Sequence, residues 1–173
     1  MDPKPDFFKD QLPSPSHGIA DYRIQVTLET ARQSIEKCIP NFVINSLEDY
    51  CQGMANQLFI VNGEYIFRFS KHAKADKTLQ RELVVLSQLR DHITTSIPNF
   101  EYSGEQDGNN LHFVGYRIIP GDELTSGTLN DADGHPDVYI TAQIAQFFNE
   151  LHSFNIDKAK SLSVPERKPK DFF

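Results

Sequence analysis

Residues 56–69, NQLFIVNGEYIFRF, carry the clearest local structural signal in the chain. Two runs rich in β-branched and aromatic residues flank Asn62-Gly63. An Asn-Gly pair in this setting predicts a two-residue type I′ hairpin, because both central positions need a positive φ. The expected register pairs Val61 with Glu64, Phe59 with Ile66, and Gln57 with Arg68.

Side chains alternate along a strand, so the second run of this hairpin has two different faces. Ile66 and Arg68 are expected on one face, and three aromatic residues on the other. The preceding segment, residues 42–51, is also rich in strand formers and leads into the hairpin through Gln52-Gly53-Met54-Ala55. The aromatic face consists of Tyr65, Phe67 and Phe69.

Apolar residues recur at helical spacing elsewhere in the chain. One amphipathic helix is expected between Thr27 as N-cap and Pro40 as stop. Further helices are expected over residues 76–93 and 138–154, and a second hairpin from residues 100–103 and 111–119. The expected fold class is therefore α+β, with about five antiparallel strands and helices packed on them.

Composition limits the possible function classes. The chain has 173 residues, 39% of them hydrophobic, which suits one soluble domain or slightly more. Its formal net charge of −7 argues against a nucleic-acid or anionic-membrane partner, because either would require a basic patch. Apolar runs such as residues 58–61 fall far short of the roughly 20 residues of a membrane span.

The two ends of the chain lack a periodic apolar face. Four prolines within the first fifteen residues predict a mobile arm over residues 1–20, and residues 155–173 are expected to form a loop or frayed end. The start of the chain lacks the layout of a signal peptide, and Cys38 and Cys51 do not form a multi-bridge scaffold. A cytoplasmic location is therefore expected.

Three segments together suit the chemistry of nucleotide phosphates. They are Gly53-Met-Ala-Asn56 between two strands, Arg68 in the next strand, and Glu82 in the helix that follows. A backbone-lined turn can approach phosphate oxygens, a basic side chain can neutralise them, and a carboxylate can hold that base in place.

With these segments in place, the sequence resembles the aminoglycoside phosphotransferases, most closely the aminoglycoside 2″-phosphotransferases, which share the protein-kinase fold. The resemblance runs in order from about residue 28 to residue 154. The segments that carry it are residues 41–46 (NFVINS), 64–72 (EYIFRFSKH), 79–86 (LQRELVVL), Ile97-Pro98, 114–121 (VGYRIIPG) and 145–152 (AQFFNELH).

The resemblance implies a division of the chain and a cofactor. Residues 21–119 would form a kinase-like N-lobe that faces the nucleotide, and residues 120–173 the hinge exit and the first helix of an incomplete C-lobe. The cofactor would be ATP or GTP with Mg²⁺, and the acceptor a hydroxyl group of an aminoglycoside or similar small molecule. The implied biological role is antibiotic resistance.

The resemblance also implies roles for individual residues. The turn from Gly53 to Asn56 would cover the triphosphate, and Ile66 would line the base pocket. Arg68 would hold the α- and β-phosphates, where most such enzymes have Lys, and Glu82 would pair with it. The stretch from Arg117 to Ile119 would be the hinge, whose backbone bonds the edge of the base.

The family's catalytic loop, His-x-Asp-x-x-x-x-Asn, and its metal-binding Asp-Phe-Gly are not found in the sequence; Asp171-Phe172 is followed by Phe173. The chain therefore contributes no catalytic residue and no metal ligand, and we expect it to be inactive alone because phosphoryl transfer depends on those groups. Truncation, a frameshift or a split gene would each produce such a chain.

Less specific interpretations exist for each of these residues. Considered alone, Arg68 fits a surface cation, Glu82 a solvated helix residue and Gly53 an ordinary turn glycine. Two other functions also remain open. One is a non-catalytic nucleotide-binding or interaction remnant, and the other is part of a kinase-fold enzyme for another hydroxyl substrate, such as a sugar, choline or a macrolide.

Overall fold

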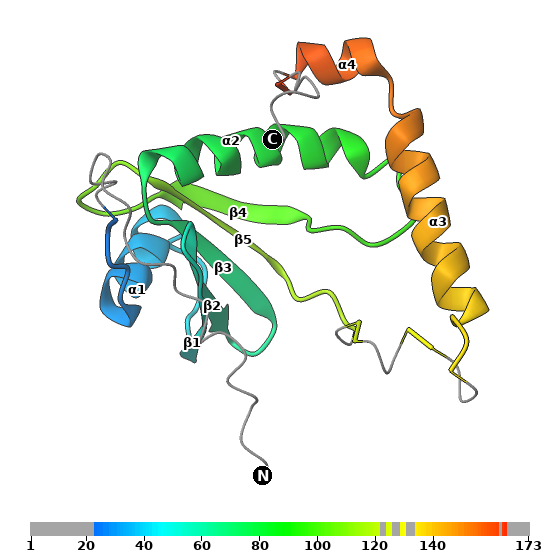
Figure 1. Cartoon of the computed structure of the whole chain (residues 1–173). Coiled ribbons are helices and arrows are strands. Elements are labelled where there is room, and N and C mark those ends of the chain that lie inside the picture. The colour runs from blue at the N-terminus through cyan, green and yellow to red at the C-terminus, as the bar shows by residue number, and fades with distance from the viewer. Residues whose placement is uncertain (1–22, 122–123, 126–128, 131–133, 163, 166–173) are drawn as a thin grey trace, which may run out of the picture.

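A computed structural model describes residues 23–121, 124–125, 129–130, 134–162 and 164–165; the expected arm over residues 1–20 lies outside them. The described chain has an α+β fold with a five-stranded antiparallel sheet in the order β1-β2-β3-β5-β4 (Figure 1). The strands are β1 (Leu47–Gln52), β2 (Asn56–Val61), β3 (Tyr65–Ser70), β4 (Phe100–Glu105) and β5 (His112–Arg117). The helices are α1 (Leu28–Cys38), α2 (Ala73–Leu89), α3 (Val138–Ser153) and α4 (Ile156–Ser161).

The central hairpin forms where it was predicted, but its register differs by one residue. Asn62 and Gly63 both have positive φ, as expected, whereas the loop has three residues because Val61 pairs with Tyr65 rather than with Glu64. Phe59 consequently pairs with Phe67, and both side chains are fully buried on one face. The predicted register would have placed these two aromatic rings on opposite faces, so burial of the aromatic face decides the register.

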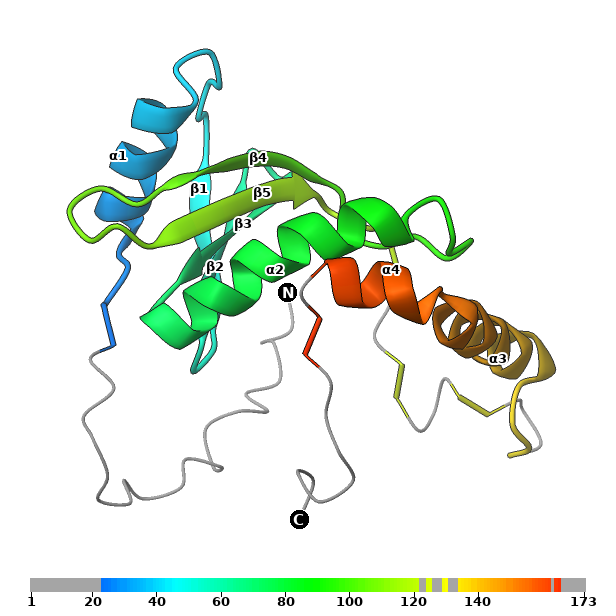
Figure 2. The same ribbon diagram turned by 90° about the horizontal axis from the view of Figure 1, so that it is seen from above.

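The main core lies between α1 and the aromatic face of the sheet. Ala31 and Ile35 of α1 are fully buried among aromatic residues of β2, β3 and β5. Helix α1 begins at the predicted cap, where Thr27 and Thr30 bond reciprocally through side chain and backbone. The other face of the sheet, which carries Arg68, faces α2 (Figure 2).

The first strand is shorter than predicted. β1 begins at Leu47, and residues 42–46 are not part of it. Asn62 accounts for this difference, because its side-chain oxygen accepts hydrogen bonds from the amides of Asn45 and Ser46, at 2.8 and 3.1 Å, and its amide group donates to Val43. The side chain thus bonds backbone groups that a longer strand would have paired.

The helices α2 and α4 differ from the predicted elements. α2 begins at Ala73 rather than residue 76, because the ring of His72 accepts the Ala75 amide as an N-cap, and it ends before Ile93. The segment after residue 155 was predicted to be irregular, but Asn155 caps the short helix α4. No helix of the described residues is long and apolar enough to span a bilayer.

Candidate functional site

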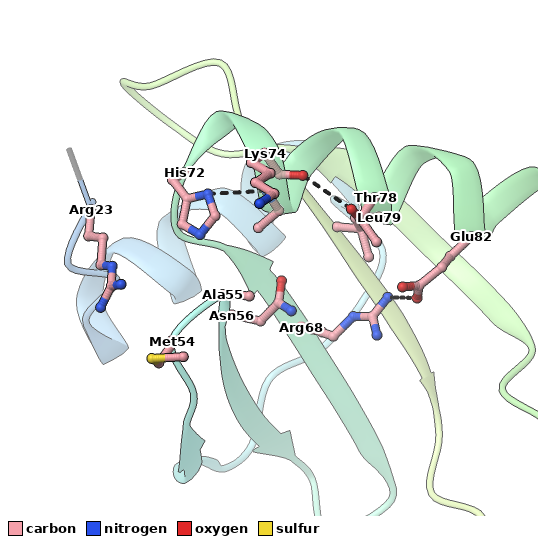
Figure 3. Close-up of a pocket in the computed structure, with 11 residues that line it drawn as sticks. Arg23, Met54, Ala55, Asn56, Arg68, His72, Lys74, Thr78, Leu79 and Glu82 are labelled. Carbon is pink, nitrogen blue, oxygen red and sulfur yellow. Dashed lines mark hydrogen bonds and ion pairs between the residues drawn. The ribbon is translucent and has the colours of Figure 1, made fainter. Parts of the chain in front are cut away.

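A pocket of about 340 Å³ lies where the β1–β2 turn, β3 and the first half of α2 meet (Figure 3). It contains three of the predicted site residues, Asn56, Arg68 and Glu82. Its full lining is Arg23, Met54, Ala55, Asn56, Arg68, His72, Lys74, Ala75, Thr78, Leu79 and Glu82.

The predicted pair of Arg68 and Glu82 forms. The guanidinium of Arg68 on β3 donates to the carboxylate of Glu82 on α2 (Figure 3), and the two side chains are 19% and 36% exposed. The same guanidinium lies 5.6 Å from the ring centre of Phe100. The Nε of Arg68 is buried and has no protein acceptor. The guanidinium of Arg68 is therefore held at the pocket wall, and its Nε–H remains a donor that no protein acceptor uses.

The β1–β2 turn forms the opposite wall. The amide of Gly53 donates to the carbonyl of Asn56 at 3.0 Å, which closes a tight turn with Met54 and Ala55 at its tip. Those two residues and Asn56 line the pocket, while Gly53 lies just outside the lining. The side-chain oxygen of Asn56 is buried and accepts no protein hydrogen bond. Backbone of this turn thus lines the pocket, and the Asn56 side-chain oxygen is left without a hydrogen-bond donor.

Lys71, the residue after β3, holds the β1–β2 turn through two hydrogen bonds. Its ammonium donates to the carbonyl of Gly53 at 3.0 Å, and its backbone amide donates to the carbonyl of Ala55 at 2.9 Å. The side chain is buried. Burial, and then the positive charge of Arg23, hold the pKa of Lys71 below its usual range.

Three side chains at the pocket rim, those of Arg23, His72 and Lys74, were not predicted from the sequence. Arg23 precedes α1, while His72 and Lys74 lie at the first turn of α2. Only His72 has a partial signal in the sequence, because it is the last residue of a segment that carries the family resemblance. Together with Arg68, the charged side chains of Arg23 and Lys74 make the pocket positively charged within an acidic chain, which suits an anionic ligand.

Three predicted residues besides Gly53 lie outside this pocket. Ile66 pairs with Tyr116 across the sheet, and burial raises the pKa of the Tyr116 phenol. The Arg117 side chain stacks on Tyr65, with its guanidinium carbon 4.8 Å from the ring centre, and ion-pairs with two glutamates rather than facing the pocket. Ile119 is partly exposed after the end of β5.

The backbone geometry at the end of β5 suits the role predicted for the hinge. The amide of Ile118 donates to the carbonyl of Glu64 at 2.8 Å, so this residue continues the β3–β5 ladder. Peptide groups alternate in direction along an antiparallel strand. The carbonyl of Arg117 and the amide of Ile119 therefore point away from β3 and are available to a ligand edge.

The described residues do not fit a metal site of their own. Among them, no group of three or more His, Cys, Asp or Glu side chains is placed to hold a metal ion. The predicted Mg²⁺ therefore has no ligand set in the described part of the chain, and no step can be assigned to it here.

No family model matches the sequence. The structure is similar to that of APH(2″)-IIIa in complex with GDP and kanamycin, with a TM-score of 0.73 and 30% identity over 82% of this chain and 48% of that one. It is also similar to the GDP complex of the wild-type IIIa enzyme, with a TM-score of 0.76 and 28% identity over 85% and 49%. The macrolide 2′-phosphotransferase of Brachybacterium faecium shares the fold alone, with a TM-score of 0.60 and 13% identity over 84% and 48%.

These similarities define the class of protein first. The chain has a kinase-like fold of the kind found in antibiotic phosphotransferases, and it spans about half the length of the solved structures it matches. Within that class, its resemblance to the aminoglycoside 2″-phosphotransferases, predicted from the sequence, is confirmed.

Proposed function

We propose that this chain is the N-terminal nucleotide-binding part of an aminoglycoside phosphotransferase-like enzyme. The observation that carries the proposal is the Arg68–Glu82 pair, which holds a guanidinium in a cationic pocket opposite a tight backbone turn. The GDP bound to APH(2″)-IIIa supports a nucleotide as the ligand of this fold. The nucleoside triphosphate is ATP or GTP.

The pocket and the neighbouring strands β3 and β5 supply different contacts to such a ligand. Arg68 neutralises the α- and β-phosphates, and the turn from Gly53 to Asn56 covers the triphosphate. Ile66 packs against the base, and the backbone of Arg117 and Ile119 bonds its edge. In this arrangement the base would lie at the end of β5 and the phosphates near the start of α2.

The complete reaction would transfer the terminal phosphoryl group to a hydroxyl of an aminoglycoside, and would confer antibiotic resistance. We place it in the cytoplasm, since both cysteines are free thiols. The 173 residues lack the catalytic-loop motif and the Asp-Phe-Gly motif. The chain therefore binds nucleotide but does not turn it over unless the remaining half of the fold is supplied.

The exposed apolar surface of α3 supports this division. The helix contains no buried residue, and Val138, Tyr139 and Phe148 are each close to half exposed or more. Its contacts with the α2–β4 connection are polar, from Glu150 and Gln146 to Thr94. Apolar side chains exposed on a helix in this way are typical of a surface that packs against further protein.

A thermal-shift titration tests nucleotide binding. ATP or GTP should raise the unfolding temperature in proportion to the logarithm of its concentration, because a ligand that binds only the folded state stabilises it. The shift should be strongly reduced in Arg68→Ala and persist in Arg90→Ala, which removes an exposed cation at the far end of α2. A stable wild-type chain without any shift would refute the proposal.

A non-catalytic nucleotide-binding module is the second candidate, favoured by the missing catalytic motifs. Mixing the chain with the second half of APH(2″)-IIIa separates the two possibilities. Phosphoryl transfer to kanamycin in the mixture, but by neither part alone, supports the enzyme. Nucleotide binding without transfer in any mixture favours the module, while transfer to a sugar, choline or a macrolide alone would assign a different acceptor.

A further inference from the structure

Lys71 is a charged side chain that is only 7% exposed. A buried ammonium is normally paired with a carboxylate, because an uncompensated charge in the interior is costly. Within the described residues, Nζ of Lys71 has no salt bridge, and its hydrogen bond goes to the carbonyl of Gly53. A positive charge therefore lies directly behind the β1–β2 turn, and no carboxylate of the described residues neutralises it.

The backbone of Lys71 fixes this arrangement in place. Its amide donates to Ala55 in the turn, and its carbonyl accepts from Ile24, in the segment that leads to α1, at 2.8 Å. Lys71 follows Arg68 by three residues at the end of β3. Lys71 thus links the β1–β2 turn, the strand that carries Arg68 and the segment before α1.

The bond to Gly53 determines where the next amide points. In a trans peptide the carbonyl and the N–H of one unit point in opposite directions. Because the Gly53 carbonyl points to Lys71, the N–H of Met54 points away from it, and Met54 lines the pocket (Figure 3). A charged donor on the carbonyl also polarises the same peptide unit and makes its N–H a stronger donor.

We infer that Lys71 is a positioning residue for the phosphate groups: it orients and polarises the Gly53–Met54 peptide so that the Met54 N–H donates to a phosphate oxygen. The positive charge behind the turn adds to the attraction. The inference rests on the proposed function, since it requires a phosphorylated ligand in this pocket. Under this inference, the binding energy that Lys71 contributes increases with the charge of the ligand.

Titration calorimetry with a ligand series tests this role. The ligands are ATP, AMP and adenosine, and the corresponding guanine series. Lys71→Met should weaken triphosphate binding roughly tenfold, the size of one charge-assisted hydrogen bond, and nucleoside binding less than about twofold. Lys71→Arg should retain most of the affinity. Lys77→Met is the matched control, because it removes an exposed charge on α2 outside the pocket.

The pH dependence of the wild-type chain gives a readout that does not depend on a folded Lys71→Met variant. Burial and Arg23 lower the pKa of Lys71, so its charge is lost at a lower pH than that of an ordinary lysine. Triphosphate affinity should therefore fall as pH rises through that pKa. In Lys71→Arg the fall should disappear, because a guanidinium stays protonated.

The outcomes separate the inference from the function on which it rests. Equal losses for nucleoside and triphosphate in Lys71→Met, or a wild-type pH profile identical to that of Lys71→Arg, would overturn the inference while nucleotide binding stands. Absence of binding to the wild-type chain by every ligand would overturn the proposed function, and the inference with it. A charge-dependent loss together with the predicted pH profile supports both.

Discussion

The guanidinium of Arg68 on β3 donates to the carboxylate of Glu82 on α2 and so joins the sheet to the helix at the wall of the pocket. Both side chains are partly buried, at 19% and 36% exposure, so water screens the pair less than a surface ion pair. Without Glu82, the guanidinium would lose the group that orients it. Under the proposed function, the pair therefore links the position of α2 to the affinity for phosphate.

A double-mutant cycle measures this link. Glu82→Ala should weaken triphosphate binding roughly tenfold, since removing one partner of a desolvated charge pair costs about 1–3 kcal/mol. Combined with Arg68→Ala, it should add almost nothing, because both changes remove the same interaction. Titration calorimetry gives the four affinities. Glu36→Ala, on an exposed part of α1, serves as control. Fully additive losses would show that the two side chains act separately.

A second prediction concerns the anchor between α2 and β5. Asp76 is 6% exposed and accepts hydrogen bonds from the backbone amide and ring of His112, at 2.5 and 3.1 Å, and from Gln80 at 2.6 Å. Asp76→Ala leaves a part-buried amide without its acceptor, which should cost about 1–3 kcal/mol of unfolding free energy in urea. Asp91→Ala, an exposed carboxylate just after α2, should change it by less than about 0.5 kcal/mol.

The parts of the site that follow from local periodicity could be predicted from the sequence. Strand alternation places Arg68 on the face opposite the aromatic core, and the helical stripe of α2 leaves Glu82 beside its apolar side. The family resemblance supplied the pairing of these two residues. Asn56 followed because it lies at the end of a turn that the sequence marks with Gly53.

The parts of the site that depend on tertiary contacts could not be predicted from the sequence. Arg23 reaches the pocket from the segment before α1, and Lys71 is buried only because the β1–β2 turn packs over it. The hairpin register depended on the partner strand burying Phe67, not on the turn sequence, which permits either loop length. His72 caps α2 although histidine is not a typical cap residue, so the sequence pattern does not mark the true start of that helix at Ala73.

A third prediction tests the close packing of β5 on β3. A Cβ on Gly115 would lie 2.6 Å from the ring of Phe67, which is fully buried. Gly115→Ala should therefore destabilise the fold by about 1–3 kcal/mol through overpacking. Adding Phe67→Leu should relieve the clash, so the double variant should lose less stability than the sum of the two single changes. Urea denaturation monitored by far-UV circular dichroism measures all three. Additive losses would contradict the contact.

The last prediction concerns the junction between the α2–β4 connection and α3, where Glu150 accepts from the amide and hydroxyl of Thr94, each at 2.8 Å, and from Gln146 at 3.0 Å. The Thr94 amide first, and then Gln146, hold the pKa of the Glu150 carboxyl below its usual range. A lowered pKa in the folded state means that this junction stabilises the fold above the unfolded pKa of about 4.3 and loses that contribution as pH falls through the folded value.

Carbon-13 NMR titration of the Glu150 carboxyl should therefore give a pKa below that of an ordinary glutamate. Gln146→Leu should raise the pKa toward the ordinary value, because it removes one donor to the carboxylate but leaves the Thr94 amide in place. Gln143→Leu, on an exposed position of the same helix, should leave it unchanged. If all three chains titrate like an unperturbed glutamate, α3 is not held on Thr94 in solution.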